Sequence, residues 1–125
     1  MVSPDLQIRS DARPGGYRDI APQDVLPHLG ELRLIDVREP DEWRSPMGHL
    51  ANAELVPLAT VPAMAVGWDR SQPILLICRS GGRSARAATI LSQMGFPTLY
   101  NLVGGMLAWE ANDLPRVFEG VRGRA

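Results

Sequence analysis

The sequence contains no lysine, because all 13 of its basic side chains are arginine. Schiff-base chemistry and the Walker-type phosphate loop both need a lysine amine, so both are excluded. A single cysteine, Cys78, excludes an intramolecular disulfide and a multi-thiolate metal site, and it points to a reducing compartment. No other residues have the spacing of metal ligands, so we expect neither a metal nor a cofactor.

Long apolar runs and an excess of one charge are also missing. No segment approaches the roughly 18 apolar residues of a membrane span. Residues 1–16 carry charged side chains and no apolar core, so they do not resemble a secretory signal. The formal net charge is -1, from 13 basic and 14 acidic side chains, which disfavours nucleic acid and anionic membranes as partners. We therefore expect a cytoplasmic protein.

A chain of 125 residues is long enough for one domain with a buried core. Residues 1–16 are polar and rich in proline and glycine, and they are predicted to form a flexible lead-in. The folded domain is expected over residues 17–115. Residues 116–125, with Gly120 and Gly123, are predicted to be a flexible tail.

Within the domain, short apolar runs alternate with stretches of helical spacing. Strands are predicted at 18–20, at an edge of the sheet, and at 32–37, 53–56, 74–77 and 98–103. Helices are predicted at 22–29, 40–43, 58–68, 84–94 and 106–111, with Pro62 kinking or shortening the third. This alternation predicts a three-layer α/β domain, a mainly parallel sheet of about five strands with helices on both faces.

The stretch around the cysteine is the most informative part of the chain. Two glycines let the backbone turn tightly, so that consecutive N–H groups point at one spot, and the helix that follows adds the positive end of its dipole. A free cysteine thiol has a pKa of about 8.5, and such surroundings can lower this to ~3.5–7.5. Cys78 is therefore a candidate nucleophile, against the alternative of a small buried apolar residue.

Four segments together resemble one family. The run Cys78, Arg79, Ser80, Gly81, Gly82, Arg83, Ser84 closely resembles the active loop of single-domain rhodaneses, the thiosulfate-type sulfurtransferases. Further matching segments contain Asp36, Val37, Arg38, Glu39, Glu42 and Trp43, then Gly48, His49, Leu50, Ala53 and Pro57, and finally Gly104, Gly105, Ala108 and Trp109. They occur in the family's order over roughly residues 17–115. Four segments in order are far more specific than any one of them.

The chain departs from the family pattern at a few turns. Asn52 stands where the family usually has glycine, and Asn112 and Asp113 fill the place of another common glycine. Ser45, Pro46 and Met47 also make the approach to Gly48 unusual. None of these positions lies in the cysteine loop, so the departures concern local turn geometry.

The resemblance implies an enzyme that moves a sulfane sulfur from thiosulfate or a similar small donor, through a Cys78 persulfide, to cyanide, a thiol or a protein thiol. Substrate binding is implied for Arg79, Ser80, Gly81, Gly82, Arg83 and Ser84, without a cofactor. For Arg79 a role in meeting the donor and simple solvation remain open, whereas Arg83 is expected to pair with a carboxylate. Asp36 and Arg38 are expected to form a structural pair beside the loop, with Glu42 as a further partner of Arg38 and His49 structural.

Loop length separates two related activities. Four residues, 79–82, lie between Cys78 and Arg83. In this length the loop resembles those of rhodaneses, whereas the loops of the related phosphatases and arsenate reductases have five residues. The resemblance therefore implies that the shorter loop holds a persulfide and not a tetrahedral oxyanion. A persulfide carrier or sulfur-sensing module would use the same loop and stays open, while the cysteine and both glycines disfavour a non-catalytic docking domain.

Overall fold

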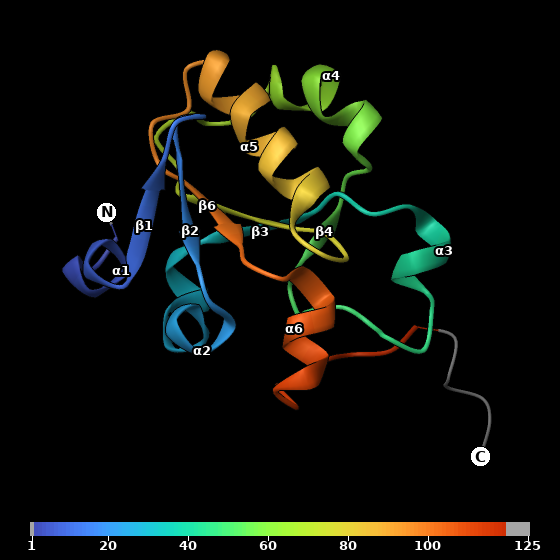
Figure 1. Cartoon of the computed structure of the whole chain (residues 1–125). Helices are drawn as coiled ribbons and strands as arrows, with labels where there is room; N and C mark the ends of the chain where they lie inside the picture. Colours follow the sequence, from blue (N-terminus) through green and yellow to red (C-terminus); the bar gives the residue numbers. More distant parts are fainter. Residues whose placement is uncertain (1, 120–125) are drawn as a thin grey trace.

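A computed structural model describes residues 2–119 of the chain (Figure 1). Its centre is a six-stranded sheet with the strand order β1-β2-β6-β5-β3-β4. The strands are β1 (Ser10–Arg13), β2 (Tyr17–Ile20), β3 (Arg33–Asp36), β4 (Glu54–Leu55), β5 (Ile74–Ile77) and β6 (Leu99–Leu102). All neighbouring strands are parallel except β1 and β2, which are antiparallel. The predicted α/β class is confirmed, with six strands instead of about five.

Helices cover both faces of this sheet, as Figure 1 shows. The helical segments are α1 (Pro4–Ile8), α2 (Pro22–Val25) with the 3₁₀ turn η1 (Leu26–Glu31), α3 (Pro40–Trp43), the 3₁₀ turn η2 (Leu58–Thr60), α4 (Val61–Ala65), α5 (Gly82–Gln93) and α6 (Gly105–Ala111). The stretch 58–68 contains two short segments, because Pro62 lies in the first turn of α4, where its missing N–H is not needed. None of the helices among residues 2–119 is long and apolar enough to cross a membrane.

The central strand β5 is buried along its whole length. Its side chains alternate between two apolar clusters, because successive residues of a strand point to opposite faces. Ile74 and Leu76 belong to the cluster that includes residues of α4 and α5, and Leu75 and Ile77 belong to the cluster with α1, α2 and α6. The carboxyl end of β5 therefore lies inside the core, and Cys78 is the residue that follows it.

The N-terminal segment differs from the predicted flexible lead-in. Within residues 2–16, α1 buries Leu6 completely and β1 pairs with β2 from Ser10 to Arg13. Pro14, Gly15 and Gly16 belong to a hairpin turn, in which Gly16 has a φ of 87°. Proline and glycine are typical of linkers and of tight turns alike, which explains the error. As a further result, β2 is an inner strand and not an edge.

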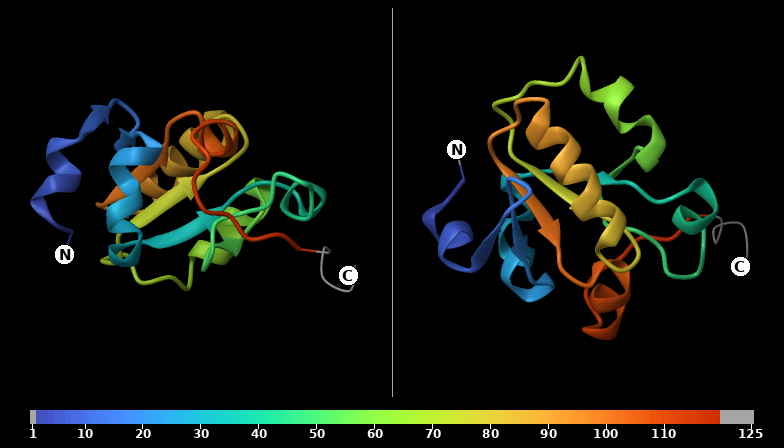
Figure 2. Two further views of the ribbon diagram at one scale, coloured as in Figure 1. Left: turned by 90° about the horizontal axis from the view of Figure 1, so that it is seen from below. Right: turned by 45° about the horizontal axis from the view of Figure 1, so that its top comes forward.

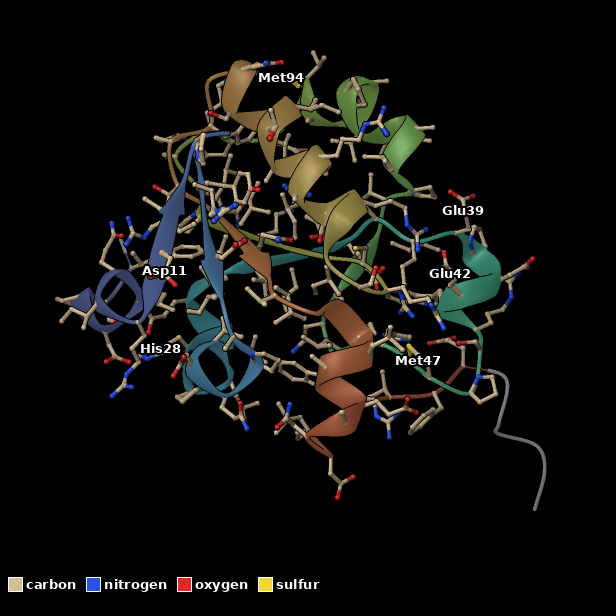
Figure 3. All side chains as sticks on the ribbon, in the orientation of Figure 1. Asp11, His28, Glu39, Glu42, Met47 and Met94 are labelled. Carbon is tan, nitrogen blue, oxygen red and sulfur yellow. The ribbon has the colours of Figure 1, made fainter. Side chains whose placement is uncertain are left out.

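α1 is also tied to the rest of the chain through His28 of η1, which Figure 3 labels. The His28 ring lies 2.7 Å from a carboxylate oxygen of Asp5 on one side and 2.7 Å from one of Glu31 on the other. Hydrogen bonds to Glu31 and then to Asp5 raise the pKa of His28 above its usual value. Figure 2 shows that α1 and α3 lie at opposite ends of the sheet.

The described part of the predicted tail is also attached to the domain. Val117 forms an isolated antiparallel bridge with His49, and Arg116 donates a hydrogen bond to the carbonyl oxygen of Met47 at 3.1 Å. Residues 120–125, which complete the predicted tail, lie outside the described residues.

We expect Leu6→Ala to lower the free energy of unfolding by about 2 kcal/mol or more, because a fully buried leucine is truncated. The matched control is Ile8→Ala on the same short helix, since Ile8 is 79% exposed and its truncation should change stability little. Urea unfolding at neutral pH measures both. Equal small effects of the two variants would contradict the docking of α1 on the core.

Candidate active site

Cys78 directly follows β5 and is 1% exposed. The loop turns into α5 at Gly81, whose φ of 106° lies in the left-handed region that favours glycine. Gly82 is the first residue of α5 and a Cβ there would meet open space. Of the two glycines predicted to shape the loop, Gly81 is thus required by backbone conformation and Gly82 is not.

The sulfur of Cys78 lies beside the first turn of a 12-residue helix. The Gly81 N–H donates to Sγ at 3.0 Å, and the hydroxyl oxygen of Ser84 lies 3.2 Å from Sγ. The positive end of the α5 dipole points at the same place. The Gly81 N–H and the helix start suit a sulfur that bears negative charge.

The first turn of α6 holds the other side of the loop backbone. The N–H of Met106 donates to the Cys78 carbonyl at 2.9 Å, and the N–H of Leu107 donates to the Arg79 carbonyl at 3.0 Å. A Cβ at Gly105 would clash with both carbonyl oxygens, which explains why glycine is needed there. The sequence analysis identified Gly105 only as part of a segment that matches the family.

Two of the arginines near the loop are paired with carboxylates. Arg83 donates from both terminal nitrogens to Glu42 of α3, each at 2.7 Å. This pairing, with smaller contributions that include a backbone hydrogen bond from Glu39, lowers the pKa of Glu42 from 4.5 to about 2. Figure 3 labels Glu42 on α3 and Glu39 directly before that helix, across from the start of α5. The predicted carboxylate partner of Arg83 is therefore Glu42.

The second pair is Asp36 with Arg38, and it is buried at the end of β3. Arg38 donates to Asp36 from Nε at 2.9 Å and from Nη2 at 2.8 Å. It also donates to the carbonyl oxygens of Gly48 at 2.8 Å and Glu42 at 3.2 Å. Glu42 is thus a partner of Arg38, as expected, and the contact is made by its backbone carbonyl.

Arg79 and Ser80 are the exposed side chains of the loop. No carboxylate among residues 2–119 lies within ion-pair distance of Arg79. It borders a pocket of about 230 Å³ together with Arg38, Asp41, Glu42, Ser45 and Met47, the last of which is labelled in Figure 3. Two larger pockets, of about 350 and 270 Å³, include no residue from 78 to 84, so we connect neither with Cys78.

His49 has no contact with the sulfur. Within the described chain, the hydrogen-bonding partners of Sγ are the Gly81 N–H and the Ser84 hydroxyl. The His49 ring stacks on Trp43 with ring centres 3.5 Å apart, and its nitrogens face the Leu50 carbonyl and Glu119. Residues 2–119 also contain no cluster of side chains suited to hold a metal ion.

The sequence analysis missed Asn101 and Asp19, two residues that hydrogen bonds connect to Ser84. Asn101 lies in β6 and is 5% exposed, and its Oδ1 accepts a short hydrogen bond from the Ser84 hydroxyl. Its Nδ2 donates to Oδ1 of Asp19 in β2 at 3.0 Å. The signal that could have found them was Asn101 itself, one amide side chain within an otherwise apolar strand.

We expect Gly81→Ala to lower the free energy of unfolding by about 1 kcal/mol or more, since an L side chain is strained at a left-handed φ. It should also slow alkylation of Cys78 by iodoacetamide, because displacing the Gly81 N–H removes a hydrogen bond that stabilises the reactive thiolate. Gly82→Ala is the matched control and should change neither measurement appreciably, since its Cβ meets open space. Equal effects of both substitutions would contradict this geometry.

The pair of Glu42 with Arg83 predicts a pH-dependent stability. Because the pKa of Glu42 is lowered in the folded state, its contribution is fully present above its ordinary pKa of 4.5 and is lost as the pH falls toward about 2. At pH 7 we expect Glu42→Gln to lower the free energy of unfolding by about 1–2 kcal/mol, after screening at this partly exposed site.

The measurement is urea unfolding of wild type and Glu42→Gln between neutral and strongly acidic pH. The difference between the two proteins should shrink as the pH falls through the stated window. Asp41→Asn is the control, since the Asp41 side chain is 99% exposed and its contact with Arg44 is long, at 3.7 Å. A difference that stayed constant across the window would show that the ion pair is not its source.

Residues 21–112 match the family model of the rhodanese-like domain. The chain is 37% identical to a putative sulfurtransferase, YtwF, of Bacillus subtilis, covering 69% of this chain and 81% of that protein. It is 32% identical to the thiosulfate sulfurtransferase GlpE of Pseudoalteromonas translucida, covering 65% and 75%.

Solved structures agree with this match. A rhodanese-related protein from Thermoplasma volcanium superposes with a TM-score of 0.75 at 31% identity, over 82% of this chain and 100% of that one. A polysulfide-sulfur transferase homodimer from Wolinella succinogenes gives 0.67 at 31% identity, over 85% and 82%. Sequence and fold together show that the chain belongs to the rhodanese-like domain family.

Proposed function

We propose that the chain is a sulfurtransferase in which Cys78 holds the transferred sulfur as a persulfide. The observation that supports this most directly is the position of Sγ at the start of α5, 3.0 Å from the Gly81 N–H, in a loop with four residues before Arg83. Relatives at 32% and 37% identity are named as sulfurtransferases. The Wolinella protein is named a polysulfide-sulfur transferase, so polysulfide joins thiosulfate as a donor to be tested.

The reaction would proceed by two displacements. The Cys78 thiolate attacks the outer sulfur of thiosulfate, a new S–S bond forms, and the donor's own S–S bond breaks as sulfite leaves with the electron pair. An acceptor then attacks the outer sulfur of the persulfide and leaves the Cys78 thiolate behind. Cyanide becomes thiocyanate in this step, and a thiolate becomes a persulfide.

The loop residues have distinct parts in this proposal. Backbone N–H groups from Arg79 to Ser84 surround the outer sulfur and stabilise its negative charge, as preorganised donors do in other anionic intermediates. Arg79, exposed beside the pocket, attracts the dianionic donor. Arg83 and the pair of Asp36 with Arg38 hold the surroundings of the loop, since their charges are already paired.

The test is the intact mass of the protein after incubation with thiosulfate or polysulfide. We expect a gain of one sulfur atom that disappears on adding cyanide, with thiocyanate released, and no gain in Cys78→Ser. Repeated formation of thiocyanate identifies a turnover enzyme, whereas a single stoichiometric transfer to a protein thiol identifies a carrier. A Cys78→Ser protein that still transferred sulfur would overturn the mechanism, and aryl-phosphate hydrolysis dependent on Cys78 would favour a phosphatase.

A further inference from the structure

We propose that Asp19 and Asn101 are positioning residues that determine where the Ser84 hydroxyl points its hydrogen, and thereby how readily Cys78 becomes a thiolate. The inference rests on the nucleophilic role proposed for Cys78. It concerns residues outside the loop, since Asp19 lies in β2 and Asn101 in β6.

A continuous row of hydrogen bonds joins Asp19 to the sulfur. Asp19 Oδ1 accepts from Asn101 Nδ2 at 3.0 Å, Asn101 Oδ1 accepts from Ser84 Oγ, and Ser84 Oγ lies 3.2 Å from Sγ. The Ser84 and Asn101 side chains are buried, so water does not substitute for the bond between them, whereas the Asp19 side chain is 26% exposed. Register pairing places Asp19 directly beside Asn101 in the parallel pair of β2 and β6.

Counting donors and acceptors fixes the direction of each bond. An ionised carboxylate only accepts, so the side of the Asn101 amide that faces Asp19 must be its NH₂ group. The amide oxygen of Asn101 therefore faces Ser84 and can only accept. The single hydroxyl hydrogen of Ser84 is used in this bond, and toward Cys78 the Ser84 oxygen presents lone pairs.

This direction suits a thiol and opposes a thiolate. A Cys78 S–H group can donate to Ser84 Oγ, whereas an anionic sulfur 3.2 Å away would face lone pairs. When the thiol proton leaves to water, the Ser84 hydroxyl has to rotate from Asn101 toward Sγ, with no covalent bond broken in the row. Asp19, by holding the amide of Asn101, therefore makes Asn101 compete with the thiolate for one hydrogen.

Other charges surround both ends of the row and must be separated from its effect. Near the sulfur these are Arg79, Arg83 with its partner Glu42, and Asp36 with Arg38; near Asp19 they are Asp11, Arg13 and Arg18. Arg13 of β1 is 3.6 Å from Asp19, an exposed contact of small energetic weight. Asp11 of β1 is the register partner of Asp19 and is labelled in Figure 3.

The experiment measures the pH profile of Cys78 alkylation by iodoacetamide in the full chain. In Asp19→Asn the new amide can donate as well as accept, so Asn101 can turn its NH₂ group toward Ser84 and release the hydroxyl to Sγ. We expect alkylation near about pH 6 to become about threefold faster or more, with the profile moved to lower pH and the limiting rate at high pH unchanged.

Two controls separate the hydrogen-bond effect from the loss of a charge. Asp11→Asn removes the same charge from the adjacent strand and should leave the profile almost unmoved. In a Ser84→Ala background there is no hydroxyl to redirect, so adding Asp19→Asn should have much less effect than it has in the wild type. If Asp19→Asn does not fold, Asp19→Ala serves instead, because it also frees the amide of Asn101.

Either of two results would overturn the proposal. One is an Asp19→Asn shift of the same size with and without Ser84, which would show a through-space charge effect. The other is no shift in Asp19→Asn at all. Because alkylation needs no sulfur donor, a chain that forms no persulfide would contradict the proposed function while leaving this test intact.

Discussion

The site depends on the two hydrogen bonds between the first turn of α6 and the carbonyls of Cys78 and Arg79. N–H groups at a helix start have no partner within the helix, and here they bind the loop instead of water. The loop backbone is thereby held between α5, which supplies donors to the sulfur, and α6. Gly105 permits this approach because any side chain there would meet the same two carbonyls.

Of the three arginines around the loop, two are paired with carboxylates of the described chain and one is not. Asp36 and Glu42 neutralise Arg38 and Arg83. The Arg83 pair connects the start of α5 to Glu42, and Arg38 connects the end of β3 to Gly48. Arg79 has no such partner among residues 2–119 and lies at the pocket. In the proposed function, Arg79 attracts the anionic donor locally, in a chain whose net charge is -1.

The N-terminal hairpin lies before the residues that match the family model. The family match begins at residue 21, and β1 and β2, which precede it, form one side of the sheet beside β6. α1 covers one end of the core through Leu6. Because Asp19 of β2 reaches Asn101, this part of the chain is connected by hydrogen bonds to the sulfur as well as to the sheet.

The sequence by itself determined the features that depend on neighbours along the chain. Apolar runs located β5 to the residue, and the glycines and helical spacing that follow placed Cys78 between a buried strand and a helix start. Only the tertiary structure decided the long-range partners: Arg83 with Glu42, 41 residues away, and Ser84 with Asn101, 17 residues away. The reason is physical, since local spacing fixes periodicity and turns, whereas packing of the layers selects which polar groups become buried together and must satisfy one another.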